Sequence, residues 1–392
     1  MLPLYYEYHN PVKILSGEAA LENIPYELHA LDAHAPLLLS DQGLQKVGAV
    51  DTVLRAITPT VPKAIFTDIP TDSSVAVVNR IAAYYKEQNC DSILAVGGGS
   101  VIDTAKGVRM VIGQGTDDIE SLMGCEVLTA GQHIPFLAVP TTAGTGSEVT
   151  PVAVISSPEK QVKQEYISAH LLPDAAILDL RMTMTLPPKV TASTGIDALC
   201  HAIESFTCLQ KNPMSDAYAA GAISLIIRHL PVAASHPRNK EARMAMANAS
   251  LMAGTAFGNS MVGLVHAIGH ALGGVCHVAH GDAMSILLPH VMVYNLDKCR
   301  DKYSNLLLHL TGPETYCATP EPLRAEEAVD VVTHFIASFA PYGLPMRLRD
   351  TGRVDPSQFL QVAETAISDG AMIVNPKAAG IPEILTILKE AF

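Results

Sequence analysis

The chain has 392 residues, too many for one average hydrophobic core, so we expect two domains. Hydrophobic residues make up 48% of the chain and charged residues 17%, a composition that excludes a disordered protein. The formal net charge is −13 and no basic run occurs, so the sequence lacks the electrostatic footprint of a protein that binds nucleic acid or an anionic membrane.

Cysteine usage and the N-terminal sequence favour a cytoplasmic protein. The seven cysteines are scattered singly without a CxxC pair, which favours free thiols in a reducing compartment. The start, MLPLYYEYHN, lacks the charged and apolar regions of a signal peptide. The longest apolar runs, such as residues 219–227, are too short to span a bilayer, and we interpret them as buried helix.

Short apolar runs alternate with helix-like segments over the N-terminal half. A helix is predicted between residues 73 and 88. The strand-like runs are residues 12–15, 35–40, 63–67, 92–96, 134–140, 153–156, 163–167 and 175–178. Strands that alternate with helices predict an α/β domain with a parallel sheet and crossover helices on its faces.

The strand at residues 35–40 leads directly into Asp41. An acid at the carboxyl end of a strand in an α/β sheet is well placed to accept a hydrogen bond from a ribose hydroxyl. An aspartate that caps the following helix explains the same residue equally well.

Residues 97–106, GGGSVIDTAK, follow the strand at residues 92–96. Ser100 can cap a helix, with Asp103 at the capping-box position. The glycines let backbone N–H groups approach an anion, and a helix N-terminus adds positive potential, so the segment favours a phosphate-bearing ligand. It is neither GxGxxG nor a P-loop, and a tight strand-to-helix turn is the alternative.

A second loop, rich in hydroxyl groups and glycine, follows the strand at residues 134–140. It contains Thr141, Thr142 and Thr145, which can hydrogen-bond to phosphates, ribose or a nicotinamide amide. Because both loops follow buried strands, we expect them at the same carboxyl edge of a parallel sheet, where ligands bind.

The sequence pattern changes after the proline pair at residues 187–188. Strand signals nearly vanish, and long segments with apolar periodicity follow, so we predict an all-helical domain over residues 187–392. The predicted helices are residues 191–208, 213–229, 240–259, 264–272, 322–339, 356–367 and 381–389.

Residues 263–281, GLVHAIGHALGGVCHVAHG, hold four of the fifteen histidines. His266 and His270 are four apart and share one face of a helix. We expect a Gly-Gly break at residues 273–274, after which His280 approaches the same point from a loop. An isolated HxxxH pair is explained equally well as an accident of a helix face.

Asp197 and His201 are also four apart, on the first predicted helix of the second domain. Singly, they are explained as a capping or surface acid and a core histidine. With His266 and His280 they make one carboxylate and three imidazoles, a suitable shell for a divalent metal such as Fe²⁺ or Zn²⁺.

GGGSVIDTAK, PTTAGTGSEVT, GIDALCHAIES and GLVHAIGHALGGVCHVAHG together resemble the iron-dependent (group III) alcohol dehydrogenases, in order and spacing along the whole chain. The resemblance implies an α/β N-terminal Rossmann-like domain that binds NAD (residues 1–186) and an all-α C-terminal domain that binds metal (residues 187–392). This is a dehydroquinate synthase-like architecture, with NAD and metal in the cleft between the domains. The resemblance also implies a homodimer or a larger homo-oligomer.

Carried over by motif position, the resemblance implies roles in metal binding and catalysis. His270 is similar to the histidine that sits beside the nicotinamide and relays a proton, and Phe257 is similar to a residue that lines the substrate pocket. His277 matches no motif histidine and has no assigned role. The implied metal ligands are Asp197, His201, His266 and His280.

The same resemblance implies a set of cofactor contacts. Asp41 would bind the adenosine ribose and disfavour a 2′-phosphate, so NAD is expected over NADP. Lys163 resembles a basic residue near the cofactor. Residues 70–72 are Pro-Thr-Asp where family members often have Pro-Asn-Pro, so a contact from that turn is not assigned. The pyrophosphate region would be held by Gly97, Gly98, Ser100 and Asp103, and the phosphates, ribose and nicotinamide side by Thr141, Thr142 and Thr145.

The expected reaction is hydride transfer between a small primary alcohol or diol, or the corresponding aldehyde, and NAD. A polyol dehydrogenase of the glycerol type and a dehydroquinate synthase-like enzyme are alternatives on the same fold. A maleylacetate reductase is disfavoured because the full ligand set is present. A non-catalytic protein that binds NAD and metal is the alternative from another class.

Overall fold

The computed structural model describes residues 3–123, 131–157 and 162–392. The chain divides into two compact units, His9–Leu186 and Pro187–Phe392, and residues 3–8 pack with the second unit. The ring of Tyr8 stacks on that of Tyr218, with 6.2 Å between centroids. The N-terminal residues therefore group with the helical unit, although the sequence alone assigns them to the α/β domain.

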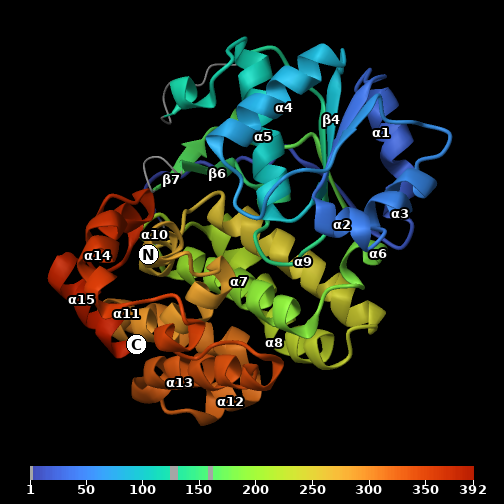
Figure 1. Cartoon of the computed structure of the whole chain (residues 1–392). Coiled ribbons are helices and arrows are strands. Elements are labelled where there is room, and N and C mark those ends of the chain that lie inside the picture. The colour runs from blue at the N-terminus through green and yellow to red at the C-terminus, as the bar shows by residue number, and fades with distance from the viewer. Residues whose placement is uncertain (1–2, 124–130, 158–161) are drawn as a thin grey trace. The chain divides into compact units, whose positions relative to one another are not determined.

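The α/β unit is built on a six-stranded sheet with the order β1-β8-β5-β4-β2-β3 (Figure 1). Every pairing in it is parallel. The predicted parallel sheet is confirmed. Its strands are β1 (Lys13–Gly17), β2 (Pro36–Leu39), β3 (Ala64–Phe66), β4 (Ser92–Gly97), β5 (Phe136–Pro140) and β8 (Ala175–Asp179).

Helices cover both faces of this sheet. Leu37 and Leu39 of β2 pack with α4 and α5, whereas Leu38 packs on the opposite face with α1 and α3. This alternation follows from the two-residue period of a strand, and burial on both faces explains why the strands are continuous apolar runs. The helices are α1 (Ile24–Ala30), α2 (Gln42–Lys46), α3 (Ala49–Ala56), α4 (Val75–Glu87), α5 (Gly99–Gln114) and α6 (Leu180–Thr183).

Two further strands of this unit stand outside the parallel sheet. β6 (Val152–Ser157) and β7 (Val162–Ile167) pair antiparallel with each other. α5 packs against β6, so the small sheet lies beside the glycine-rich segment that begins α5.

The second unit is helical, as predicted. α7 lies at its centre and packs against α8, α9 and α11, and its residues Ile196, Leu199 and Ile203 are almost fully buried. The helices are α7 (Pro188–Thr207), α8 (Pro213–Ser235), α9 (Lys240–Phe257), α10 (Leu264–Cys276), α11 (His280–Thr311), α12 (Pro313–Ala318), α13 (Arg324–Ala337), α14 (Phe359–Ile367) and α15 (Ile381–Glu390).

The histidine-rich segment differs from the sequence expectation. Gly273 and Gly274 lie inside α10 and do not end it. The helix ends at Cys276, and its C-cap is His277, whose φ of 56° places it in the left-handed region. His280 is the first residue of α11, a 32-residue helix that the sequence analysis did not predict, so the expected loop at His280 is wrong.

α8 is the one helix of the described residues that is long and apolar enough to cross a membrane. It has 23 residues and a mean hydropathy of 1.4. It is therefore longer than the apolar run at residues 219–227, which the sequence analysis considered too short to span a bilayer. It packs against α7 and α9, and core helices of soluble proteins have the same length and composition.

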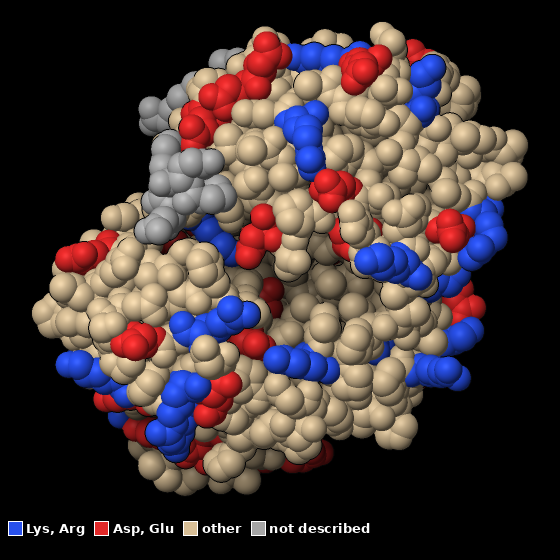
Figure 2. All heavy atoms as spheres, in the orientation of Figure 1, with Lys and Arg blue, Asp and Glu red and all other residues tan. Residues whose placement is uncertain are grey.

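Acidic and basic side chains are interspersed over the face of the molecule shown in Figure 2.

Candidate metal centre and cofactor-binding loops

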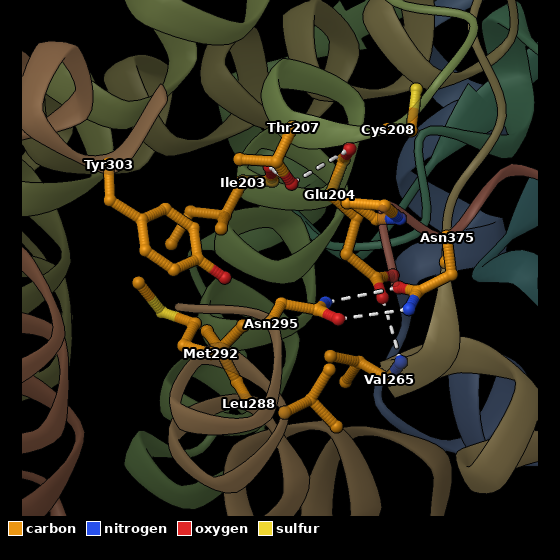
Figure 3. Close-up of a pocket in the computed structure, with 13 residues that line it drawn as sticks. Ile203, Glu204, Thr207, Cys208, Val265, Leu288, Met292, Asn295, Tyr303 and Asn375 are labelled. Carbon is orange, nitrogen blue, oxygen red and sulfur yellow. Dashed lines mark hydrogen bonds between the residues drawn. The ribbon is translucent and has the colours of Figure 1, made fainter. Parts of the chain in front are cut away.

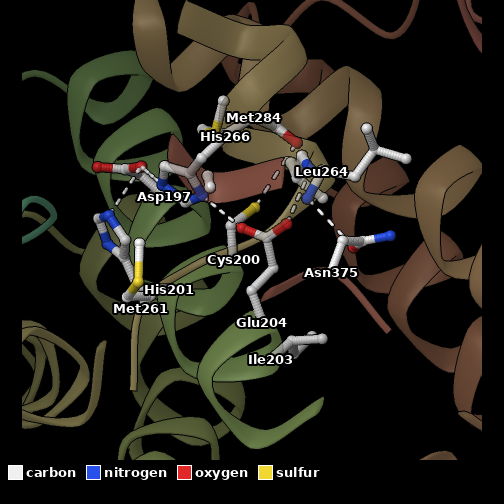
Figure 4. Close-up of polar contacts among 12 residues, drawn as sticks. Asp197, Cys200, His201, Ile203, Glu204, Met261, Leu264, His266, Met284 and Asn375 are labelled. Carbon is white, nitrogen blue, oxygen red and sulfur yellow. Dashed lines mark hydrogen bonds and ion pairs between the residues drawn. The ribbon is translucent and has the colours of Figure 1, made fainter. Parts of the chain in front are cut away.

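Four side chains from three helices of the second unit point toward one another. Asp197 and His201 come from α7, His266 comes from α10, and His280 begins α11. Oδ1 of Asp197 lies 3.9 Å from Nε2 of His201 and 3.8 Å from Nε2 of His266 (Figure 4). The same oxygen lies 3.3 Å from Nε2 of His280. The structure thus brings together the four residues that the sequence proposed as metal ligands.

The chemistry of this cluster fits a divalent cation. Asp197 Oδ1 and His266 Nε2, which lie 3.8 Å apart, are buried and have no hydrogen-bond partner among the described residues. One ligand atom each from Asp197, His201 and His266 lies within 4.8 Å of the others. Ligands about 2.0–2.2 Å from a shared cation are themselves about 3–4 Å apart, so the separations suit Zn²⁺ or Fe²⁺.

The electrostatics of the cluster favour the protonation states that bind metal. Burial lowers the pKa of His201 to about 3, so its imidazole is neutral at physiological pH. Burial opposes ionisation of Asp197, but the neighbouring His201, His280 and His266 hold its pKa below the usual range. Burial also lowers the pKa of His266, so the Asp197 carboxylate lies beside two neutral imidazoles, an electron-donating arrangement that favours a cation.

Aromatic stacking fixes the orientation of two of these rings. Phe257, at the end of α9, stacks on His201 with 4.3 Å between centroids, and His201 stacks on His266 at 4.5 Å. Phe257, which the resemblance implies is a pocket residue, therefore lies directly against the cluster.

His270 has a carboxylate partner that the sequence analysis missed. Its Nδ1 lies 2.9 Å from Oδ2 of Asp369, and its ring stacks on that of His280 at 5.5 Å. The other Asp369 oxygen accepts a hydrogen bond from the Ala371 N–H, which fixes the carboxylate. No local pattern marked Asp369, because the contact joins distant parts of the chain.

Glu204 was also missed. Its Oε2 lies 2.5 Å from Nδ1 of His266, on the side of the ring away from Asp197 (Figure 4). Burial raises the pKa of Glu204 to about 7, against the effect of the backbone N–H groups of Gly263 and Val265. One signal was available: Glu204 follows Asp197 by seven residues, two helical turns on the same face.

The two glycine-rich and hydroxyl-rich loops of the α/β unit lie side by side, as predicted. β4 and β5 are neighbours, with Gly97 opposite Pro140, and the Thr141 N–H donates to the Gly97 carbonyl at 3.0 Å. A Cβ at Gly99 would lie 2.8 Å from Cγ2 of Thr145, so this close approach requires glycine. The loops stand at the carboxyl edge of the parallel sheet, where α/β folds bind ligands.

Ser100 and Asp103 do not form the expected capping box. The N-cap of α5 is Gly98, which has no side chain to offer, and the Ser100 hydroxyl donates to the Thr71 carbonyl. Asp103 accepts hydrogen bonds from the Ser147 hydroxyl and, at 3.1 Å, from the Val154 N–H. The Asp103 carboxylate thus holds the second loop and β6 in place.

Asp41 and Lys163 complete the predicted cofactor set. Asp41 follows β2, which pairs with β4, and its Oδ1 caps α2 by accepting from the Leu44 N–H at 2.8 Å. The capping explanation is therefore correct, and it leaves the residue at the carboxyl edge of the sheet. Lys163 of β7 forms an ion pair with Asp72, in the turn that departs from the family pattern, at 3.1 Å.

Comparison with known proteins decides the family. Residues 191–392 match the sequence model of the Fe-containing alcohol dehydrogenase family, C-terminal, and residues 11–180 match that of iron-containing alcohol dehydrogenase. The chain belongs to the iron-containing alcohol dehydrogenase family. The resemblance inferred from the motifs is thereby confirmed.

Members of the family are similar over their whole length. The 1,3-propanediol dehydrogenase of Klebsiella pneumoniae is 36% identical, with 99% of each chain covered. The NAD-dependent methanol dehydrogenase of Bacillus methanolicus is 33% identical, with 97% of this chain and 98% of that one covered. A crystal structure of 1,3-propanediol oxidoreductase matches with a TM-score of 0.93 at 35% identity, covering 99% of this chain and 100% of that one. An alcohol dehydrogenase of Oenococcus oeni gives a TM-score of 0.92 at 31% identity, over 99% and 100% of the chains.

Proposed function

We propose that this member of the iron-containing alcohol dehydrogenases transfers hydride between small primary alcohols or diols and NAD, or runs the reverse reduction of aldehydes. The observation that carries the proposal is the cluster of Asp197, His201, His266 and His280, in which Oδ1 of Asp197 lies within 3.9 Å of the Nε2 atom of each histidine. The similarity to a 1,3-propanediol dehydrogenase and to an NAD-dependent methanol dehydrogenase supports short alcohols and NAD.

We propose the four clustered residues as the ligands of a divalent metal, with Fe²⁺ favoured and Zn²⁺ also compatible with the ligand set. Such a cation, when bound, supplies Lewis acidity toward an alcohol oxygen. The imidazoles of His201, His266 and His280 and the carboxylate of Asp197 would hold this cation.

We propose that NAD binds at the carboxyl edge of the parallel sheet. Backbone N–H groups at Gly97, Gly98 and the start of α5 suit its pyrophosphate, with Ser100 beside them. Thr141, Thr142 and Thr145 offer hydroxyl groups to the phosphates, ribose and nicotinamide, and Asp103 positions their loop. Asp41 is proposed to bind the adenosine ribose and to repel a 2′-phosphate, and Lys163 to lie near the cofactor.

His270 is the proposed proton carrier. Its Nδ1 is engaged by Asp369, which favours a ring whose Nε2 accepts the alcohol proton. The same geometry returns a proton when an aldehyde is reduced. We further propose that the protein is cytoplasmic and forms a homodimer or a larger homo-oligomer, as the family resemblance implies.

A substrate panel tests this function. The protein is loaded with Fe²⁺ or Zn²⁺ and supplied with NAD and a series of primary alcohols, diols and glycerol, and net NADH formation is measured. We expect the highest kcat/KM with a short primary alcohol or diol. A preference for glycerol would assign the polyol dehydrogenase reaction instead. Absence of net NADH formation with every alcohol would contradict the proposal and favour a dehydroquinate synthase-like use of NAD.

A further inference from the structure

The Glu204 carboxylate contacts a proposed ligand on the side of its ring that does not face the other ligands. Glu204 is 5% exposed and lies on α7. One of its oxygens is 2.5 Å from Nδ1 of His266, and the other accepts the Val265 N–H at 2.7 Å (Figures 3 and 4). Both oxygens are thus tied to α10, one to its backbone and one to its histidine.

These contacts determine which ring nitrogen of His266 carries the proton. An imidazole that binds a cation through Nε2 carries its proton on Nδ1, so Nδ1 of His266 is the donor and Oε2 of Glu204 the acceptor. Nε2 is then the deprotonated nitrogen, and it is the atom that lies 3.8 Å from Oδ1 of Asp197 with no hydrogen-bond partner. Glu204 therefore selects the tautomer that can bind a cation.

The surroundings hold Glu204 firmly in this position. A Cβ at Gly263 would lie 3.1 Å from Oε1 of Glu204 and 2.9 Å from Oδ1 of Asn375, so only glycine allows the chain to pass this close. Asn375 accepts the Leu264 N–H at 3.2 Å and pairs with Asn295 (Figure 3). The start of α10 is thus fixed to a buried polar network that includes the carboxylate.

His201 lacks such a partner. Its Nδ1 is buried and has no hydrogen-bond partner among the described residues, and its ring is held instead by stacking on Phe257. The carboxylate contact is therefore a specific property of His266 and does not recur at its neighbour.

We propose that Glu204 is a positioning residue for the metal centre. It fixes the tautomer and ring orientation of His266 and increases the basicity of Nε2, and it touches neither substrate nor cofactor. Carboxylates that act in this way through a histidine ligand typically raise metal affinity by about ten- to hundredfold. The inference rests on the proposed metal site and adds a fifth residue to it.

Metal affinity without substrate or NAD tests this role. Zn²⁺ is titrated into the metal-free protein in competition with a chromophoric chelator, for the wild type and for Glu204→Gln. The glutamine side chain can donate to Nδ1 and so favours the tautomer with its proton on Nε2. We expect Glu204→Gln to bind Zn²⁺ about ten- to hundredfold more weakly. Equal affinities would overturn the proposal.

Two controls separate positioning from folding. Asn295→Ala perturbs the same buried network without touching a ligand, and we expect its affinity for Zn²⁺ to match the wild type. In a His266→Ala background, we expect Glu204→Gln to leave the remaining affinity unchanged. An equal loss in Asn295→Ala, or a persistent effect of Glu204→Gln without His266, would show that Glu204 acts through the fold.

Far-UV circular dichroism shows whether the Glu204→Gln protein folds. If it does not, a second variant tests the same proposal. Glu204→Asp keeps the charge but withdraws it from His266 by one methylene, and we expect an intermediate loss of affinity. Wild-type affinity in a folded Glu204→Asp protein would overturn the proposal. A wild type that binds no Zn²⁺ would instead contradict the proposed metal site itself.

Discussion

Nδ1 of His270 lies 2.9 Å from Oδ2 of Asp369, a contact between residues 99 positions apart in the chain. The other oxygen of Asp369 caps the short helix at Gly370–Val374. The carboxylate is therefore fixed to the backbone and in turn fixes the proposed proton carrier.

Asp369→Asn is expected to lower kcat for alcohol oxidation by at least about tenfold, because the amide no longer holds His270 in one tautomer. The Kd for NAD should stay near the wild-type value. Steady-state kinetics and a cofactor titration check both. Asp355→Asn is the matched control, since Asp355 caps a similar short helix without contacting a histidine. A wild-type kcat in Asp369→Asn would rule out this role.

Asp41→Ser is expected to narrow the preference for NAD over NADP by about tenfold, because it removes a charged acceptor and a source of repulsion toward a 2′-phosphate. Serine is chosen because it can still cap α2, which Asp41 caps through the Leu44 N–H. The ratio of kcat/KM for the two cofactors measures the effect. Asp51→Asn, at an exposed acid of α3, should leave the ratio unchanged. An unchanged ratio in Asp41→Ser would show that Asp41 only caps its helix.

The raised pKa of Glu148 predicts that the stability of the protein depends on pH. Burial raises its pKa from 4.5 to about 7, with Lys106 acting in the opposite direction. The folded state therefore binds more protons than the unfolded state between these values, so this group's contribution to the free energy of unfolding falls as pH rises from 4.5 to 7. Relative to Glu148→Gln, the wild type should lose about 2–3 kcal/mol across this range.

Urea unfolding at several pH values below 8 measures this difference. The pH range stops at 8 because burial lowers the pKa of Lys106 to about 8, and this group would also titrate above that pH. Glu87→Gln changes an exposed glutamate of α4 and is the control. Its free energy of unfolding should change with pH in the same way as that of the wild type. Parallel curves for Glu148→Gln as well would contradict the prediction.

The sheet and most helices were predictable because their signals are local. A strand buried on both faces is a continuous apolar run, and Ser92–Gly97 was recognised from that run alone. Part of the cluster of proposed ligands was likewise predictable, since Asp197 and His201 share a helix face at a spacing of four residues.

The other features depend on contacts distant in sequence. Glycine costs about 1 kcal/mol in a helix interior, so Gly273 and Gly274 indicated a break, but tertiary packing keeps both inside α10. Glu204 and Asp369 contact histidines 62 and 99 residues away. The spacing from Asp197 places Glu204 on the same helix face, but no local pattern identifies its partner or that of Asp369. Ser100 was expected to cap a helix that begins one residue before it, at Gly99.

Removal and restoration of metal tests the proposed function most directly. The protein is dialysed against a chelator, and NADH formation from 1,3-propanediol is measured before dialysis, after it, and after addition of Fe²⁺ or Zn²⁺. We predict that activity is lost with the metal and returns when it is restored, and that Asp197→Ala protein neither retains metal nor regains activity. Full activity in protein shown to be free of metal would contradict the proposal.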